Sequence, residues 1–188
     1  MTAHHFPDSA RGPAQADLSE LDAELVTTEK LDGGALTFTR DAVQTAQPWD
    51  RPATALWTMI AHHIPDHWRV CGESMWARRG IAYTDLPGVF IVHGIWDETD
   101  TLLGWDDTVD WAERLELPVV PVLYRGASLS EARAAWWRRR DQRDSEGYVV
   151  RRAGRVPAAL LPQRLLCWVR PGHVKVPAGE PFEVNEFA

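Results

Sequence analysis

The stretch TTEKLDGGALTFTR, residues 27–40, places a single lysine, Lys30, directly before an Asp-Gly-Gly turn. The sequences on either side alternate with a period of two, which predicts two strands, residues 23–29 and 34–40, joined as a hairpin by residues 32–34. The lysine then has two interpretations. It is an ordinary surface residue beside a turn, or it is a nucleophile that the glycines allow a phosphate to approach.

Nucleophilic chemistry sets a condition on this amine. A lysine with the usual pKa of about 10.4 is almost entirely charged at neutral pH, and a charged amine is not a nucleophile. The pKa of Lys30 must therefore be lowered, and a nearby divalent metal ion or a second cation would lower it.

The composition is that of a globular domain. The chain has 188 residues, of which 45% are hydrophobic and 25% are charged, and this length predicts one domain with a buried core. Its two cysteines have no framework spacing, which indicates a reducing cytoplasm. The sequence contains no signal peptide and no apolar run long enough to span a membrane. Residues 1–22 are mostly polar and small, so we expect them to be partly mobile.

The charge is distributed unevenly. A net charge of -7 argues against a surface that coats nucleic acid broadly. However, residues 133–175 contain 11 Lys or Arg against 3 Asp or Glu, which predicts a face for an anionic ligand on an otherwise acidic body. The basic run WWRRRDQR, residues 136–143, can equally be the solvated side of a helix.

Apolar periodicity predicts an α/β (α+β) fold with mostly antiparallel sheets, because strands and helices do not alternate as they do in doubly wound proteins. In chain order, the predicted elements are strands at 23–29 and 34–40, a helix at 51–65, strands at 67–73 and 88–97, a helix at 104–116, a strand at 117–126, a helix at 128–140, and strands at 146–152 and 164–170.

Three further pieces could act together with Lys30, although each alone is more often a structural residue. Glu73 follows a glycine at the end of a strand, where a carboxylate can accept both hydroxyls of a ribose. The strand at 88–97 can turn one flat side chain, His93 or Phe90, toward a heterocycle. Glu146 enters a β-branched strand and can hold a metal ion.

Together and in this order, the pieces resemble the covalent nucleotidyltransferase superfamily of RNA ligases, DNA ligases and mRNA capping enzymes, and most of all the small bacterial ATP-dependent RNA ligases. The resemblance covers residues 25–175. It is carried by TEKLDGG at the nucleophile motif, RVCGESMWARRGIAYTDLP at the ribose-contacting motif, VFIVHGIWD at the base-stacking strand, WDDTVDWAERLELPVVPVLYRG after it, EGYVVR at the metal- and phosphate-proximal motif, and WVRPGHV at the end.

The resemblance implies a nucleotidyltransferase (ATP-grasp-like) fold, with helices flanking the sheets around a nucleotide cleft. Residues 23–188 are then expected to form a single domain without an ancillary OB or C-terminal domain. It also implies a cytoplasmic RNA repair enzyme. Lys30 would attack the α-phosphate of ATP, expel pyrophosphate and form lysyl-AMP. The AMP would pass to an acceptor, probably an RNA 5′-phosphate, which a 3′-hydroxyl then attacks to seal the strand.

The same resemblance assigns the site residues. Glu146 is expected to be catalytic together with Lys30 and to hold Mg²⁺ or Mn²⁺. Glu73 is expected to hold the ribose, and His93 to stack on the adenine. The complete set of residues expected at the nucleotide is Glu29, Asp32, Gly33, Glu73, His93, Phe90, Arg170 and Lys175.

The chain departs from the family pattern at two places. The arginine that usually follows the nucleophile turn is missing from the stretch around Ala46, and the usual lysine before the last aromatic residue is Cys167. Losing one preorganised charge donor commonly lowers a rate by about 10²–10³. Two alternatives to RNA ligation therefore stay open: an adenylyltransferase redirected to a small molecule or a protein, and a catalytically silent module that binds a nucleotide or RNA ends.

Overall fold

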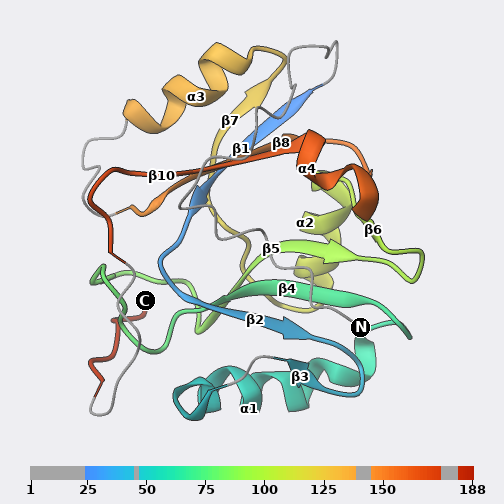
Figure 1. The fold of residues 1–188 in the computed structure, drawn as a ribbon. Helices are drawn as coiled ribbons and strands as arrows, with labels where there is room; N and C mark the ends of the chain where they lie inside the picture. The colour runs from blue at the N-terminus through green and yellow to red at the C-terminus, as the bar shows by residue number, and fades with distance from the viewer. Residues whose placement is uncertain (1–23, 45–46, 139–144, 175–181) are drawn as a thin grey trace.

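Two antiparallel sheets form the body of the molecule (Figure 1). The structure is a computed structural model that describes residues 24–44, 47–138, 145–174 and 182–188. The N-terminal segment that was expected to be mobile, Ala46 and Lys175 lie outside the described residues. Within them, no helix is long and apolar enough to cross a membrane.

The first sheet has four strands in the order β10-β8-β1-β7, and β1 and β8 are its central strands. One face is covered by helix α3, which packs Trp136 against Leu25 of β1 and Tyr148 of β8. This helix begins where the sequence predicts, because the Ser128 hydroxyl accepts a hydrogen bond from the Glu131 N–H. The elements are β1 (Leu25–Lys30), β7 (Val122–Gly126), α3 (Leu129–Trp137), β8 (Gly147–Arg152) and β10 (Leu165–Val169).

The second sheet has six strands in the order β3-β2-β4-β5-β6-β9. This sheet packs against helix α1, and helix α2 packs against β5 (Figure 1). The elements are β2 (Gly34–Phe38), β3 (Val43–Gln44), α1 (Arg51–Ile60), β4 (Arg69–Ser74), β5 (Phe90–Trp96), β6 (Thr101–Leu102), α2 (Trp105–Arg114), β9 (Val156–Pro157) and the short helix α4 (Leu161–Arg164), with 3₁₀ turns at Pro48–Asp50, Ala61–His63 and Ala158–Leu160.

The predicted fold class and the order of the main elements are confirmed, but the predicted hairpin is wrong. Strand β1 pairs with β8 and β7, whereas β2 pairs with β3 and β4 in the other sheet. Because both edges of β1 are occupied, the chain after Lys30 must leave the first sheet. Gly33 permits this crossing, since a Cβ there would lie 2.8 Å from the Glu73 Cβ and 2.9 Å from the Ser74 carbonyl oxygen.

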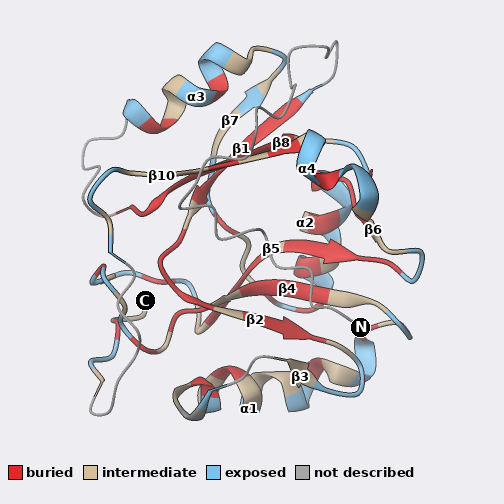
Figure 2. Ribbon diagram, viewed as in Figure 1, coloured by how far each residue is buried: buried red, intermediate tan, exposed pale blue. Residues whose placement is uncertain are grey.

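The inner faces of the two sheets meet in a shared core. Cys71 of β4 packs with Val149 of β8 and Cys167 of β10, so residues from both sheets form one apolar cluster. Figure 2 shows that β1, β5 and β8 are the most continuously buried strands. Polar side chains on these strands are therefore held in a rigid, largely water-free setting.

Candidate active site

Lys30 and Glu146 form a buried ion pair. Lys30 is the last residue of β1, and it lies opposite Gly147 in the antiparallel register with β8. Glu146, directly before β8, therefore comes beside the lysine, and its Oε1 atom lies 2.7 Å from the Lys30 Nζ atom. The two side chains are only 10% and 4% exposed. The structure thus joins two of the predicted site residues across 116 positions of sequence.

Gly147 is a packing requirement of this arrangement. A Cβ on Gly147 would lie 1.9 Å from the Trp168 carbonyl oxygen of β10, a distance that no side chain could occupy. The glycine therefore lets β10 and β8 approach closely at the position where Glu146 enters the sheet. The Arg170 N–H, just after β10, donates to the Glu146 carbonyl oxygen over 2.9 Å and secures the same point.

The charge state of Lys30 differs from the condition derived from the sequence. Burial by itself would lower the pKa of Lys30, but the carboxylates of Glu146 and Glu73 outweigh burial and hold this pKa above its usual 10.5. In this arrangement the amine is charged. The charge around Lys30, which comes mainly from Glu146 and Glu73, must therefore change before the amine can act as a nucleophile.

Asp32, two residues after the lysine, is fully buried, and only part of its hydrogen-bonding capacity is used. Its Oδ2 atom accepts a hydrogen bond of 2.7 Å from the Gly80 N–H, and its own N–H donates to the Tyr83 hydroxyl oxygen over 2.9 Å. Its Oδ1 atom is buried without a hydrogen-bond partner among the described residues. Asp32 therefore lies in a buried polar cluster rather than in a hairpin turn.

His173 is a site residue that the sequence analysis missed. Its Nε2 atom lies 3.4 Å from the Asp32 Oδ2 atom, and its side chain is 3% exposed. One ligand atom from each of Asp32, Glu146 and His173 can be chosen so that all lie within 4.8 Å of one another. The only signal in the sequence was its place in WVRPGHV, the last motif, where no spacing links it to Asp32.

Glu73 and His93 come from the second sheet. Glu73 lies on β4 and is close enough to Lys30 to raise the pKa of its amine. His93 lies on β5, where the pairing shifts so that Cys71 faces Gly94 and Gly72 faces Val92. His93 is therefore the extra residue of a β-bulge, a feature that commonly redirects a side chain near a site. Both side chains are half-buried.

Phe90 does not belong to the candidate site. Its ring is fully buried and stacks on Phe38 with 4.1 Å between the ring centroids. It lies in the core cluster that packs the second sheet against α1. The sequence-based expectation that Phe90 contacts a nucleotide is wrong, because this side chain has no exposed surface to offer.

The final motif is arranged around Glu146. Cys167 is buried on β10, and its side chain contributes to the electrostatics at Lys30. Arg170 lies just beyond the end of β10, where its Nε–H donates to the Ser145 carbonyl oxygen over 3.0 Å. Its guanidinium group is therefore near the ion pair, although the strand predicted at 164–170 ends one residue earlier.

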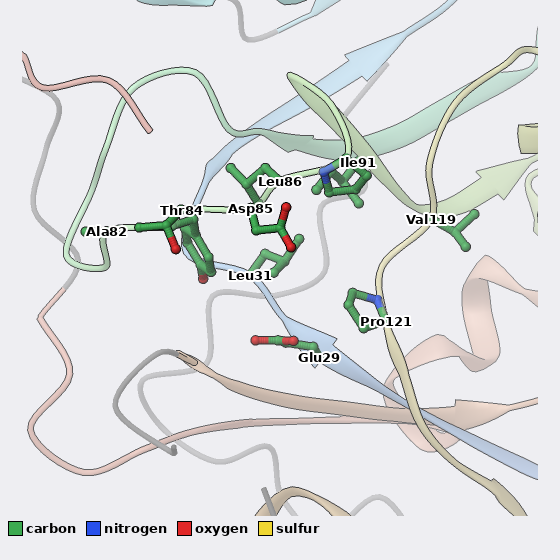
Figure 3. Close-up of a pocket in the computed structure, with 11 residues that line it drawn as sticks. Glu29, Leu31, Ala82, Thr84, Asp85, Leu86, Ile91, Val119 and Pro121 are labelled. Carbon is green, nitrogen blue, oxygen red and sulfur yellow. The ribbon is translucent and has the colours of Figure 1, made fainter. Parts of the chain in front are cut away.

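Glu29 lines a cavity. This cavity of about 400 Å³ is lined by Glu29 and Leu31, the two neighbours of Lys30, and by Tyr83, Asp85 and Ile91 (Figure 3). Neither Glu73 nor His93 lines it. Neighbouring residues of a strand point to opposite sides, so Glu29 faces this cavity while the Lys30 amine faces Glu146. Tyr83 lines the cavity and contacts Asp32, so the cavity lies next to the group around the lysine amine.

No curated protein matches the chain. Among solved structures, it is similar to a mutant of a Naegleria gruberi RNA ligase determined with ATP and Mn, at 15% sequence identity and a TM-score of 0.50. The alignment covers 77% of this chain but only 52% of the Naegleria protein, and it shows a shared fold. A family model described as RNA ligase matches residues 23–160, which is most of the sequence, and the chain therefore belongs to the RNA ligase family.

Proposed function

We propose that this protein is an ATP-dependent nucleotidyltransferase of the RNA-ligase type, which carries AMP on Lys30 and transfers it to an RNA 5′-phosphate end. The observation that carries the proposal is the lysine itself, whose side chain is 10% exposed and whose amine is held 2.7 Å from a buried carboxylate. A lysine that served only solubility would lie in solvent. Membership of the RNA ligase family and the relative solved with ATP and Mn support the same reaction class.

In the first step, the Lys30 Nζ atom attacks the α-phosphorus of ATP. A nitrogen–phosphorus bond forms, the bond from that phosphorus to the bridging oxygen breaks, and pyrophosphate leaves. The attacking amine must be uncharged, so its ion pair with Glu146 must break when the nucleotide binds. Once Glu146 is engaged elsewhere, its charge and its hydrogen bond no longer raise the pKa of Lys30, and burial, the largest single influence on this pKa, acts to lower it.

The carboxylates fit a divalent cation. Glu146 Oε2 and Asp32 Oδ1 are buried without hydrogen-bond partners among the described residues, and oxygen atoms of this kind are the preferred ligands of Mg²⁺ and Mn²⁺. Asp32 and Glu146 would hold the ion, which would neutralise charge on the phosphates.

Other residues would orient the substrates. Glu73 would accept hydrogen bonds from the ribose hydroxyls, since it lies close enough to Lys30 to raise the pKa of that amine, and His93 would lie against the adenine. Arg170 would meet a phosphate at the edge of the site. The basic sequence around it, residues 133–175, would attract the RNA end.

The chain allows an unusually clean test, because it contains only two lysines, Lys30 and Lys175. The protein is incubated with α-labelled ATP and Mg²⁺ or Mn²⁺, and the acid-labile label on protein is measured. We expect label on the wild type and on Lys175→Arg, and none on Lys30→Arg. Equal label on Lys30→Arg, or label that peptide mapping places on another residue, would refute the proposal.

The acceptor is tested by discharging the labelled protein. Addition of RNA with a 5′-phosphate should release the label as AMP joined to the RNA end, and RNA with a 5′-hydroxyl should not. Cys167 occupies the place of the family's usual lysine, which is the specific reason to include other acceptors. Discharge only by a small molecule or by a protein would replace RNA as the substrate while leaving the lysine chemistry intact.

A further inference from the structure

We propose that His173 is a direct metal ligand, which completes a site with Asp32 and Glu146 and makes it prefer a transition-metal ion such as Mn²⁺ over Mg²⁺. This inference rests on the proposed function, because it concerns the same site. It adds a residue that the sequence did not assign to the site and predicts which metal the protein selects.

The three side chains have the spacing of a coordination sphere. Their ligand atoms lie within 4.8 Å of one another. Ligand atoms about 2.1–2.3 Å from one ion lie roughly 3–4.5 Å apart, depending on the angle between them. A small contraction would therefore bring all three to one cation without moving the backbone.

Each of the three residues also has a buried polar atom that lacks a hydrogen-bond partner among the described residues, namely Asp32 Oδ1, Glu146 Oε2 and His173 Nε2. Leaving one such atom unsatisfied costs about 1–3 kcal/mol, and more for a charged group. Three of them on neighbouring side chains are unlike ordinary packing. A shared cation would satisfy all three.

The position of His173 is fixed by its own sequence. Arg170, Pro171, Gly172 and His173 form a tight turn in which the His173 N–H donates to the Arg170 carbonyl oxygen over 3.2 Å. Gly172 has a φ of 79°, so the proline and glycine occupy the positions that a type II turn favours. The Arg170 N–H holds this turn to Glu146.

A second glycine brings the imidazole close to Asp32. A Cβ on Gly80 would lie 2.9 Å from the Asp32 Oδ2 atom and 3.2 Å from the His173 Cε1 atom. Any larger residue at this position would push the two groups apart. The neighbouring Arg170 Nη2 atom lies 3.5 Å from the His173 Nδ1 atom, at the outer limit of a hydrogen bond. A neutral imidazole that binds a metal ion through Nε2 carries its proton on Nδ1, so the Arg170 guanidinium group must shift.

The nitrogen ligand decides the metal preference. Mg²⁺ binds oxygen ligands almost exclusively and keeps most of its water, whereas imidazole favours first-row transition metals. A site of two carboxylates alone would bind Mg²⁺ and Mn²⁺ with similar affinity. With His173 we expect Mn²⁺ to bind at least about 10-fold more tightly than Mg²⁺.

The test uses the nucleotide-free protein and the metal ions alone, so that it does not depend on Lys30 reacting with ATP. Mn²⁺ binding is followed by the loss of the free-ion signal in electron paramagnetic resonance, and Mg²⁺ binding by competition. Electron spin echo modulation of bound Mn²⁺ should show coupling to a nitrogen nucleus, and histidine labelled with ¹⁵N should change that coupling.

His173→Gln should weaken Mn²⁺ binding by about 10–100-fold, abolish the nitrogen coupling, and change Mg²⁺ affinity little. His63→Gln is the matched control, because His63 is an exposed histidine, and it should leave every reading unchanged. If His173→Gln does not fold, the coupling in the wild type decides the question. Absence of that coupling, absence of saturable Mn²⁺ binding, or equal affinities for both ions would overturn the proposal, while protein labelling by ATP would still test the proposed function separately.

Discussion

The two ends of β1 carry opposite kinds of charge cluster. At the start of the strand, Arg125 donates hydrogen bonds to both oxygens of Glu24 and both oxygens of Asp106, with distances of 2.6–2.9 Å. At the end, Lys30 meets Glu146. The side chains of the first cluster are 41–68% exposed, whereas those of the second are almost fully buried.

The two clusters differ in how completely their carboxylate oxygens are hydrogen-bonded as well as in burial. Each carboxylate oxygen in the Arg125 cluster accepts a hydrogen bond, and the guanidinium group lowers the pKa of Glu24 and of Asp106. The Lys30 cluster retains a buried oxygen, Glu146 Oε2, without a partner among the described residues. A saturated, exposed network ties elements together, whereas a buried network with spare ligand atoms is arranged for a bound group.

The largest effect should come from Glu146→Gln. This change keeps the size of the side chain but removes the charge that would hold a cation, so we expect protein labelling by ATP to fall at least about 100-fold. Glu131→Gln, which removes an exposed carboxylate of α3, is the control and should label normally. Equal labelling of the two variants would mean that the buried cluster is no more functional than an exposed one.

Gly147→Ala should show how strongly the buried cluster depends on packing. Because the new Cβ would overlap the Trp168 carbonyl oxygen, we expect the free energy of unfolding in urea to fall by about 3 kcal/mol or more. Gly154→Ala is the matched control, since nothing lies within 4 Å of its added Cβ, and it should change stability by less than about 0.5 kcal/mol. Similar losses of unfolding free energy in both variants would contradict the close approach of β10 to β8 at Gly147.

The reactivity of Lys30 toward an amine-acylating reagent measures its charge. Because its pKa is raised, Lys30 in the nucleotide-free protein should react more slowly at about pH 9 than a free lysine side chain, and the rate should rise about tenfold per pH unit below the pKa. In Glu146→Gln, burial should outweigh the remaining carboxylate and lower the pKa, so Lys30 should react faster at the same pH. Mass spectrometry of the modified peptide follows both rates. A slower reaction in the variant would show that Glu146 is not the group that holds the proton on the amine.

The smallest effect belongs to the other end of β1. Arg125→Ala removes an exposed network that solvent already screens, so we expect the melting temperature to fall by no more than about 3 °C and labelling by ATP to stay unchanged. A calorimetric scan and the labelling assay check both. A collapse of labelling in this variant would join the two clusters functionally and remove the distinction between them.

Local patterns in the sequence predicted the elements well and their partners poorly. The strand predicted at 88–97 formed as β5, Phe90–Trp96, and Ser128 capped a helix, because periodicity and capping depend on nearby residues. The hairpin after Lys30 failed because alternation does not say which strand will pair with β1. The ordered motifs grouped Lys30 with Glu146 correctly, but only the fold could bring His173 to Asp32, since no local rule connects a Pro-Gly turn to a distant aspartate.

The crossing after Lys30 also limits how the molecule can move. Only Leu31, Asp32 and Gly33 separate β1 from β2, so the connection spans at most about 10–14 Å, and β2 pairs directly with the strand that carries Glu73. The connection between β8 and β9, residues 153–155, is equally short, and it joins the two sheets at the opposite end of β1, where Leu25 pairs with Arg152. The sheets are therefore tied together at both ends of the strand that carries the nucleophile, and this double connection resists any rocking of one sheet against the other.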